Sequence, residues 1–329
     1  MDIHLLQTLV NAHGVSGDEQ EVRELLASLC TNYADDMITD PMGSLIVHRR
    51  GFGPKILLAA HMDTVGCVIT HIEKNGFLRF AQVGGLDPAS ILQAPVRFRN
   101  GVLGLISCND DQVGKQLNLR NLFIDIGAQD EQDAKSQISE GDTAAFATPW
   151  LENNGKVISP YMDNRAGCAV LVEVLRRVQS RKNDLYVAFT AQEELGMRGA
   201  GPVSFRVEPD WALAVDVTCP DDLPGPLHEG TTALGAGAAI KMMDHRVLCT
   251  RSVVEKLRKL AHTSKIPCQM DLLSCGGTDA GPMQISRGGV PTGGVSIPCR
   301  YTHAPTELIA AQDYDAVVEL ITAFCESEL

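Results

Sequence analysis

Apolar residues recur along this chain with two different spacings, and their alternation predicts the fold. Short continuous apolar runs, typical of strands buried on both faces, occupy four places: residues 55–60, 185–189, 211–215 and 290–297. Apolar residues three or four positions apart, typical of helices, occupy four others: residues 22–29, 167–178, 251–260 and 313–325. This alternation favours an α/β fold with a mixed, largely parallel sheet flanked by helices.

The stretch from residue 65 to 158 has a different pattern. It is rich in Gly, Asn, Asp and Pro, its apolar runs are short, and helical spacing occurs only near residues 130–139. We expect a small β-rich domain here, inserted into an α/β domain made of residues 1–64 and 159–329.

The first long helix has a recognisable start. Ser16 and Glu19 stand three residues apart just before the apolar positions that begin at Val22. This is the spacing of a capping box, in which the two side chains accept hydrogen bonds from the free N–H groups at a helix N-terminus. The pattern predicts that Ser16 caps this helix.

The charge balance excludes several classes of partner. The chain has 28 Lys+Arg against 41 Asp+Glu, a net charge of −13, with no basic run to compensate. Such a field repels nucleic acid and anionic membranes, and the longest uncharged apolar stretch, residues 233–240, is too short to span a bilayer. The ten cysteines include no C-x-x-C pair, and the first residues show no signal-peptide core. We therefore expect reduced thiols, a cytoplasmic location, and neither nucleic acid nor membrane as a partner.

Residue types that bind metals stand just beyond four of the predicted strands. These residues are His61 and Asp63, Glu193 and Glu194, Asp216, and His303. Asp163, on a predicted turn before the helix at residues 167–178, adds another carboxylate. Because sites in α/β sheets form beyond the carboxyl ends of the strands, we expect these side chains to meet in one crevice.

The composition of this set indicates more than one metal ion. Leaving Asp63 aside, the two imidazoles, three carboxylates and a spare glutamate exceed the needs of one zinc ion and suit two divalent ions that share a carboxylate. Taken singly, a histidine after a strand is usually structural and a glutamate pair is usually a solvated face. The same placement at four strand ends favours a site. The other histidines lack this setting and are expected to be structural: His4, His13, His48, His71, His228, His245 and His262.

Five motifs follow one another along nearly the whole chain: 61–63 (HMD), 163–165 (DNR), 193–196 (EELG), 215–218 (VDVT) and 296–303 (SIPCRYTH). Together they resemble the co-catalytic metallo-aminopeptidases of the tetrahedral (TET), glutamyl and deblocking aminopeptidase family. The resemblance implies an α/β peptidase domain with a PDZ-like insertion. It also implies that the insertion builds a homo-oligomer, expected to be a dodecamer, around the active sites.

The resemblance also implies a role for each site residue. It assigns two ligands to each metal ion and one to both: His61 and Asp216, Glu194 and His303, and the bridging Asp163. Glu193 would act as general base, and Asp63 would orient the imidazole of His61. Two divalent ions per subunit are expected, with zinc first and cobalt or manganese as alternatives.

The expected activity is the removal of N-terminal residues from peptides with free N-termini. A related amidohydrolase or deacylase could use the same ion pair, and activity on N-acyl compounds would distinguish it. Relatives have also been labelled endoglucanases. A glycosidase needs two metal-free carboxylates and generally aromatic side chains on which the sugar rings pack. The chain has only 2 tryptophans and 5% aromatic residues, which gives little support to a glycosidase. A silent self-assembling scaffold is disfavoured because no expected ligand is replaced.

Overall fold

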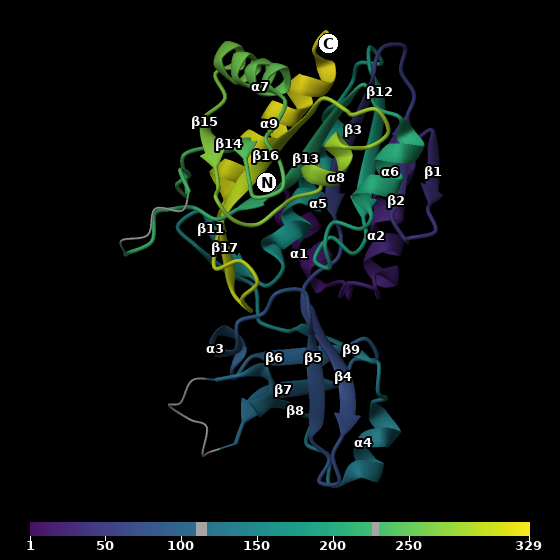
Figure 1. The fold of residues 1–329 in the computed structure, drawn as a ribbon, viewed down its shortest axis with the longest axis vertical. Coiled ribbons are helices and arrows are strands. Elements are labelled where there is room, and N and C mark those ends of the chain that lie inside the picture. The colour runs from purple at the N-terminus through teal and green to yellow at the C-terminus, as the bar shows by residue number, and fades with distance from the viewer. Residues whose placement is uncertain (110–116, 226–229) are drawn as a thin grey trace.

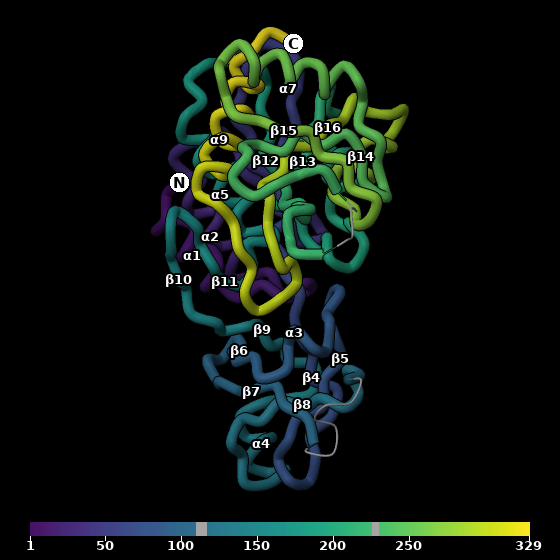
Figure 2. The backbone as a smooth tube through the Cα atoms, turned by 90° about the vertical axis from the view of Figure 1, so that its left-hand side faces the viewer, coloured from purple at the N-terminus to yellow at the C-terminus, as the bar shows by residue number. Residues whose placement is uncertain are grey.

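The computed structural model describes residues 1–109, 117–225 and 230–329. A large sheet flanked by helices lies next to a smaller β-barrel, and both views show them as two bodies joined at one end (Figures 1 and 2). The predicted fold class, α/β with a largely parallel sheet and a small β-rich domain, is confirmed.

The large sheet is built around four parallel strands. In sheet order they are β12 (Asp184–Thr190), β3 (Lys55–His61), β13 (Trp211–Thr218) and β16 (Thr292–Arg300). On the β12 side the sheet continues with two antiparallel strands, β2 (Leu45–Arg49) and β1 (Asp36–Thr39). On the β16 side it continues with β17 (Glu307–Ala310), β11 (Lys156–Ser159) and β10 (Leu151–Asn153). Two further strands extend from β16: β14 (Ala238–Met243) and β15 (Cys268–Leu272).

Helices cover this sheet on both sides, so its strands are buried and read as continuous apolar runs. One face carries α1 (Ile3–Asn11), α2 (Gln20–Cys30), α5 (Met162–Arg177) and α9 (Ala311–Glu326) (Figure 2). The other carries α6 (Ala200–Val207) and α8 (Ala280–Gln284), which lie in front of β3 and β13 in Figure 1. Helix α7 (Arg251–Ser264) packs on α9 and β14. Among the described residues, none of the helices has the length and apolar content needed to cross a lipid bilayer.

The smaller body is a closed barrel with its own apolar core. Its strands, in barrel order, are β4 (Gly66–Ile72), β5 (Leu78–Val83), β8 (Leu122–Asp125), β7 (Leu103–Cys108), β6 (Pro95–Phe98) and β9 (Thr143–Phe146). In the described part of this body, three short helical segments accompany them: α3 (Pro88–Ile91), η3 (Leu119–Asn121) and α4 (Glu131–Gln137). The range 65–158 that we expected for the insertion contains the whole barrel. It also contains β10 and most of β11, which pair with the large sheet instead.

The predicted capping box at the start of α2 is wrong. Helix α2 begins at Gln20, after Glu19, and is followed by the short 3-10 turn η1 (Thr31–Tyr33). Ser16 lies four residues before the helix, and its hydroxyl donates a hydrogen bond to Asp63 instead of capping the helix. A tertiary partner has therefore replaced the local one that the spacing predicted.

Candidate metal centre

The four central parallel strands bring the expected ligands to one edge of the sheet. His61 is the last residue of β3, and Asp216 lies near the end of the neighbouring β13. Glu193 and Glu194 follow the end of β12, and His303 follows the end of β16. Parallel strands place their carboxyl ends together, so residues 242 positions apart in sequence meet here (303 − 61 = 242).

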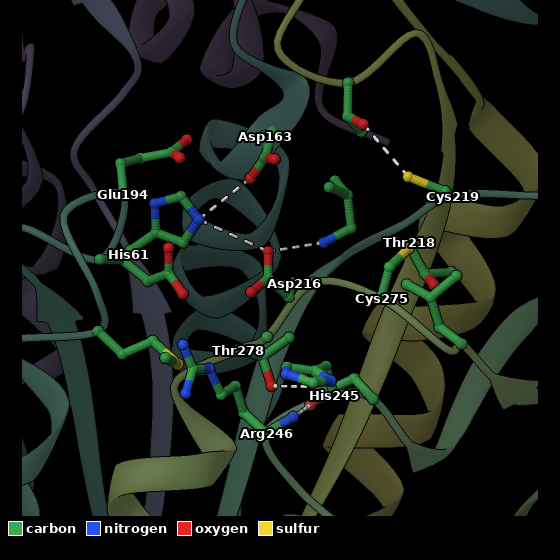
Figure 3. A pocket seen from close by; sticks show the side chains of 18 of the residues that line it. His61, Asp163, Glu194, Asp216, Thr218, Cys219, His245, Arg246, Cys275 and Thr278 are labelled. Carbon is green, nitrogen blue, oxygen red and sulfur yellow. Dashed lines mark hydrogen bonds and ion pairs between the residues drawn. The ribbon is translucent and has the colours of Figure 1, made fainter. Parts of the chain in front are cut away.

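Asp163 lies at the centre of this group. Its Oδ1 is 3.1 Å from Nε2 of His61, and its Oδ2 is 3.4 Å from Nε2 of His303. Nε2 of His61 is also 3.6 Å from Oδ1 of Asp216, and Nε2 of His303 is 3.2 Å from Oε2 of Glu194. Figure 3 shows His61 directed at both Asp163 and Asp216. Each oxygen of the Asp163 carboxylate therefore faces a different imidazole.

This position of Asp163 depends on irregular backbone at the start of α5. Asp163 and Asn164 have non-helical torsion angles, and the peptide bond between them is cis. The Asn164 side chain donates to the carbonyl of Val215, and its Oδ1 accepts from the N–H of Gly167. Asn164 thus anchors this turn to β13, the strand that carries Asp216.

The donor set fits divalent metal ions. Two groups each have ligand atoms within 4.8 Å of one another: His61, Asp163 and Asp216, and Asp163, Glu194 and His303. Oε1 of Glu194 is buried and has no hydrogen-bond partner among the described residues. Imidazole nitrogens and carboxylate oxygens are suitable ligands for zinc, cobalt or manganese, and a buried oxygen without a donor is costly unless a cation or proton satisfies it.

The imidazoles are surrounded by negative charge. Burial disfavours the charged form of His303, but the carboxylates of Asp163 and Glu194 outweigh it and raise its pKa to about 12. The same balance, with Asp163 and Asp216 as neighbours, raises the pKa of His61 well above its usual value. Because a ligating imidazole must be neutral, metal binding would displace the protons that these carboxylates favour.

Glu193 stands beside this group without belonging to either cluster. It lines the same cleft, and burial raises its pKa well above the usual range of a glutamate. The negative charges of Asp279 and Asp216 add to this rise, whereas His61 opposes it. Asp279 is itself buried, and burial raises its pKa to about 7.

Asp63 makes contacts beyond the one expected with His61. Nδ1 of His61 is 3.1 Å from the backbone oxygen of Asp63 and 3.6 Å from its carboxylate. That carboxylate accepts hydrogen bonds from the backbone N–H groups of Glu193 (2.9 Å) and Glu194 (3.2 Å) and from Ser16 Oγ (2.5 Å). Asp63 therefore contacts both the imidazole and the turn that carries the two glutamates.

Glu307 was missed by the sequence analysis. Its side chain is 1% exposed, and its two oxygens accept hydrogen bonds from the N–H of Asp163 (2.8 Å) and the N–H of His303 (2.7 Å). Glu307 thus holds the backbone of two expected ligands. It lies at the start of the short strand β17, and no feature of its local sequence distinguishes it.

A cleft of about 440 Å³ opens from the metal centre. Its wall includes Cys219, His245, Arg246 and Thr278, which Figure 3 places around the histidine and carboxylates. His245, which was expected to be structural, lies in this wall. His228, expected to be structural as well, lies outside the described residues.

Comparison with known proteins finds relatives over almost the whole chain. The family M42 glutamyl aminopeptidase matches residues 43–320. Lysyl aminopeptidase of Pyrococcus furiosus is 31% identical over 341 residues, covering 99% of this chain and 97% of that protein. The structure of aminopeptidase APDkam598 from the archaeon Desulfurococcus kamchatkensis is 35% identical with a TM-score of 0.94, covering 98% of this chain and 94% of that one. The Pyrococcus horikoshii TET1 peptidase, reported to assemble into a tetrahedron or a large octahedral shell, is 28% identical with a TM-score of 0.87, covering 98% of both chains.

Proposed function

The chain belongs to the M42 glutamyl aminopeptidase family, and on this premise we propose a two-metal mechanism for its metallo-aminopeptidase activity. The reaction is hydrolysis of the N-terminal residue from a peptide. One observation carries the proposal: the two oxygens of Asp163 face the imidazoles of His61 and His303, at 3.1 and 3.4 Å. A carboxylate in this position suits a bridge between two ions.

The ligand set would divide between the ions as the family resemblance implies. His61 and Asp216 would hold one ion, Glu194 and His303 the other, and Asp163 would contact both. When bound, two divalent ions polarise the carbonyl of the scissile bond and lower the pKa of a water molecule. Zinc is the expected metal, with cobalt and manganese as alternatives.

Glu193 is the general base in this mechanism. Its carboxylate takes a proton from the attacking water and later gives that proton to the leaving amine, which is the usual double role of one carboxyl group. Burial raises the pKa of Glu193, which makes its carboxylate a stronger base than an exposed glutamate. Asp63 supports the same step by holding the backbone of Glu193 and by contacting His61.

We also propose that the barrel, together with the rest of residues 65–158, mediates assembly into a closed homo-oligomer, as a dodecamer. The likeness to a peptidase that forms a tetrahedron supports this. The net charge of −13 argues against nucleic acid or anionic membranes as partners, and ten free cysteines are compatible with a cytoplasmic location. Light scattering that reports a fully active monomer would contradict the assembly.

A substrate panel tests the proposed function. Purified protein would be given aminoacyl chromogenic substrates and their N-acetylated counterparts, after loading with zinc, cobalt or manganese. We expect hydrolysis of the free-amine series, about two ions per chain by elemental analysis, and loss of activity on chelation. Hydrolysis of only the N-acetylated series would indicate a deacylase, and full activity in a metal-free preparation would rule out the mechanism.

A further inference from the structure

The two glutamates of the site sit on a turn that has little regular structure of its own. Residues 192–194, which we call the glutamate turn, follow β12 and belong to no helix or strand. Gln192 has a φ of 55°, in the left-handed region that costs a residue other than glycine about 1–2 kcal/mol. A turn of this kind keeps one conformation only if its surroundings hold it.

Two buried carboxylates hold the glutamate turn through its backbone. Oε1 of Glu19 accepts a hydrogen bond from the N–H of Gln192 at 3.2 Å, and Asp63 accepts from the next two N–H groups, those of Glu193 and Glu194. Glu19 is 4% exposed and Asp63 is 0% exposed. Three consecutive N–H groups thus end on carboxylates, and the left-handed residue is bound by Glu19.

The segment that supplies Glu19 also supports Asp63. Ser16 Oγ donates to Oδ2 of Asp63 at 2.5 Å, and the N–H of Gly17 donates to Oε1 of Glu19 at 2.7 Å. Residues 15–20, which we call the N-terminal segment, therefore contact the glutamate turn both directly through Glu19 and indirectly through Ser16.

The N-terminal segment is in turn fixed by the barrel. Val15 is fully buried in the barrel core. The carboxylate of Asp18 accepts hydrogen bonds from Thr143 Oγ1 at 2.7 Å and from the Arg99 guanidinium at 2.9 Å. Ser16 and Glu19 face the glutamate turn, whereas Val15 and Asp18 face the barrel, so the segment is held from both sides. A rigidly held segment can position what it contacts.

We propose that Ser16 and Glu19 are positioning residues for the aminopeptidase reaction, which hold Glu193 in place through the backbone of the glutamate turn. The proposal rests on the role proposed above for Glu193. Neither residue touches the reacting atoms. Their effect is on where the Glu193 carboxylate stands, and a displacement of about 1 Å at a catalytic group can cost about 100-fold in rate.

The experiment compares Glu19→Ala, Glu19→Gln and the control Glu24→Ala, each with wild type in parallel. Glu24 is an exposed glutamate on α2, the helix that directly follows Glu19, and its carboxylate accepts a hydrogen bond from the Gln20 side chain. We expect Glu19→Ala to lose about 10- to 100-fold in kcat, with KM and metal content unchanged. Glu19→Gln should keep most of the activity, because its amide oxygen can still accept the two N–H groups. Glu24→Ala should match wild type.

Two further variants separate positioning from general destabilisation. A glycine at position 192 adopts the left-handed conformation without a penalty. In the background of Gln192→Gly, Glu19→Ala should therefore lower kcat clearly less than it does in the wild-type background. Ser16→Ala removes one donor from Asp63 and should lower kcat several-fold, again without metal loss.

Each of three results would overturn the proposal: wild-type kcat in Glu19→Ala, loss of metal in proportion to activity, or equal losses in Glu19→Gln and Glu19→Ala. If wild type itself hydrolyses no free-amine substrate, the proposed function fails instead. A thermal unfolding scan of every variant shows whether its loss of kcat follows a loss of folding stability.

Discussion

The two halves of the proposed metal centre are held in different ways. His61 and Asp216 belong to adjacent parallel strands of the central sheet and are 2% and 6% exposed. Glu194 and His303 lie on loops beyond the strands, and the side chain of His303 is 38% exposed with a φ of 64°. We call these the strand half and the loop half, and Asp163 belongs to both.

The difference shows what a loop needs in order to carry a ligand. The strand half is placed by ladder hydrogen bonds and by the core beneath it. The loop half relies on buried carboxylates that accept backbone N–H groups: Asp63 holds Glu194, and Glu307 holds His303. A loop ligand therefore depends on supporting residues whose loss would leave the sheet intact.

Removing the metal should have the largest effect and should separate the two halves. Complete chelation is expected to abolish activity. Because His303 is far more exposed than His61, the ion of the loop half should leave first. Metal release during dialysis against a chelator would be followed by elemental analysis, and we expect a fast phase from the loop half and a slow phase from the strand half. The variant His303→Asn should lack the fast phase. A fast phase that persists in this variant would assign it to the strand half.

Substitutions of the two adjacent glutamates should show two roles within the loop half. Glu193→Gln keeps its shape and both ions but cannot accept a proton, so kcat should fall by about 10²–10⁴-fold with KM little changed. Glu194→Gln removes one charged ligand and should weaken one ion. Metal content and kcat would be measured for both variants. If Glu193→Gln loses metal and Glu194→Gln stays loaded but inactive, the two roles are reversed.

Glu307→Gln tests the support of the loop half directly. A glutamine has one acceptor oxygen where the carboxylate has two, so Asp163 or His303 loses its backbone partner. Metal binding should weaken by about 10–100-fold, as measured by competition with a chelator. Glu173→Gln is the control, a buried glutamate ten residues further along α5 than Asp163 (173 − 163 = 10). Equal metal affinities in Glu307→Gln and Glu173→Gln would show that Glu307 does not support the loop half.

Gly84→Ala should have the smallest effect and tests the contact between barrel and loop half. Gly84 has a φ of 76°, and a Cβ there would lie 2.7 Å from Val65 Cγ1 and 3.3 Å from Glu194 Cβ. Gly127→Ala is the matched control, with a φ of 73° and no atom of the described residues within 4 Å of the added Cβ. Both should lose about 1–2 kcal/mol of stability. Only Gly84→Ala should weaken metal binding, by a few-fold in a chelator competition, and the same loss in Gly127→Ala would exclude the contact as its cause.

The strand half was the easier one to predict. His61 and Asp216 come directly after or within apolar runs, and such runs are local signals that survive in any fold with a buried sheet. Glu194 and His303 were expected to join them through the family resemblance and through their position beyond other strands. Glu307, in contrast, lies 144 residues from Asp163 in sequence, and no periodicity connects the two.

The sequence by itself determined the alternation of strands and helices, the break in pattern at the barrel, and the ligand types at the strand ends. These depend on local propensity and on which residues must be buried. Only the tertiary structure decided the extent of the barrel, where β10 and β11 pair, and the partners of Ser16, Glu19 and Glu307. The physical reason is that a polar side chain near a site binds whichever buried group the fold brings to it. For Ser16 that group was Asp63, 47 residues away, and not the helix N-terminus beside it.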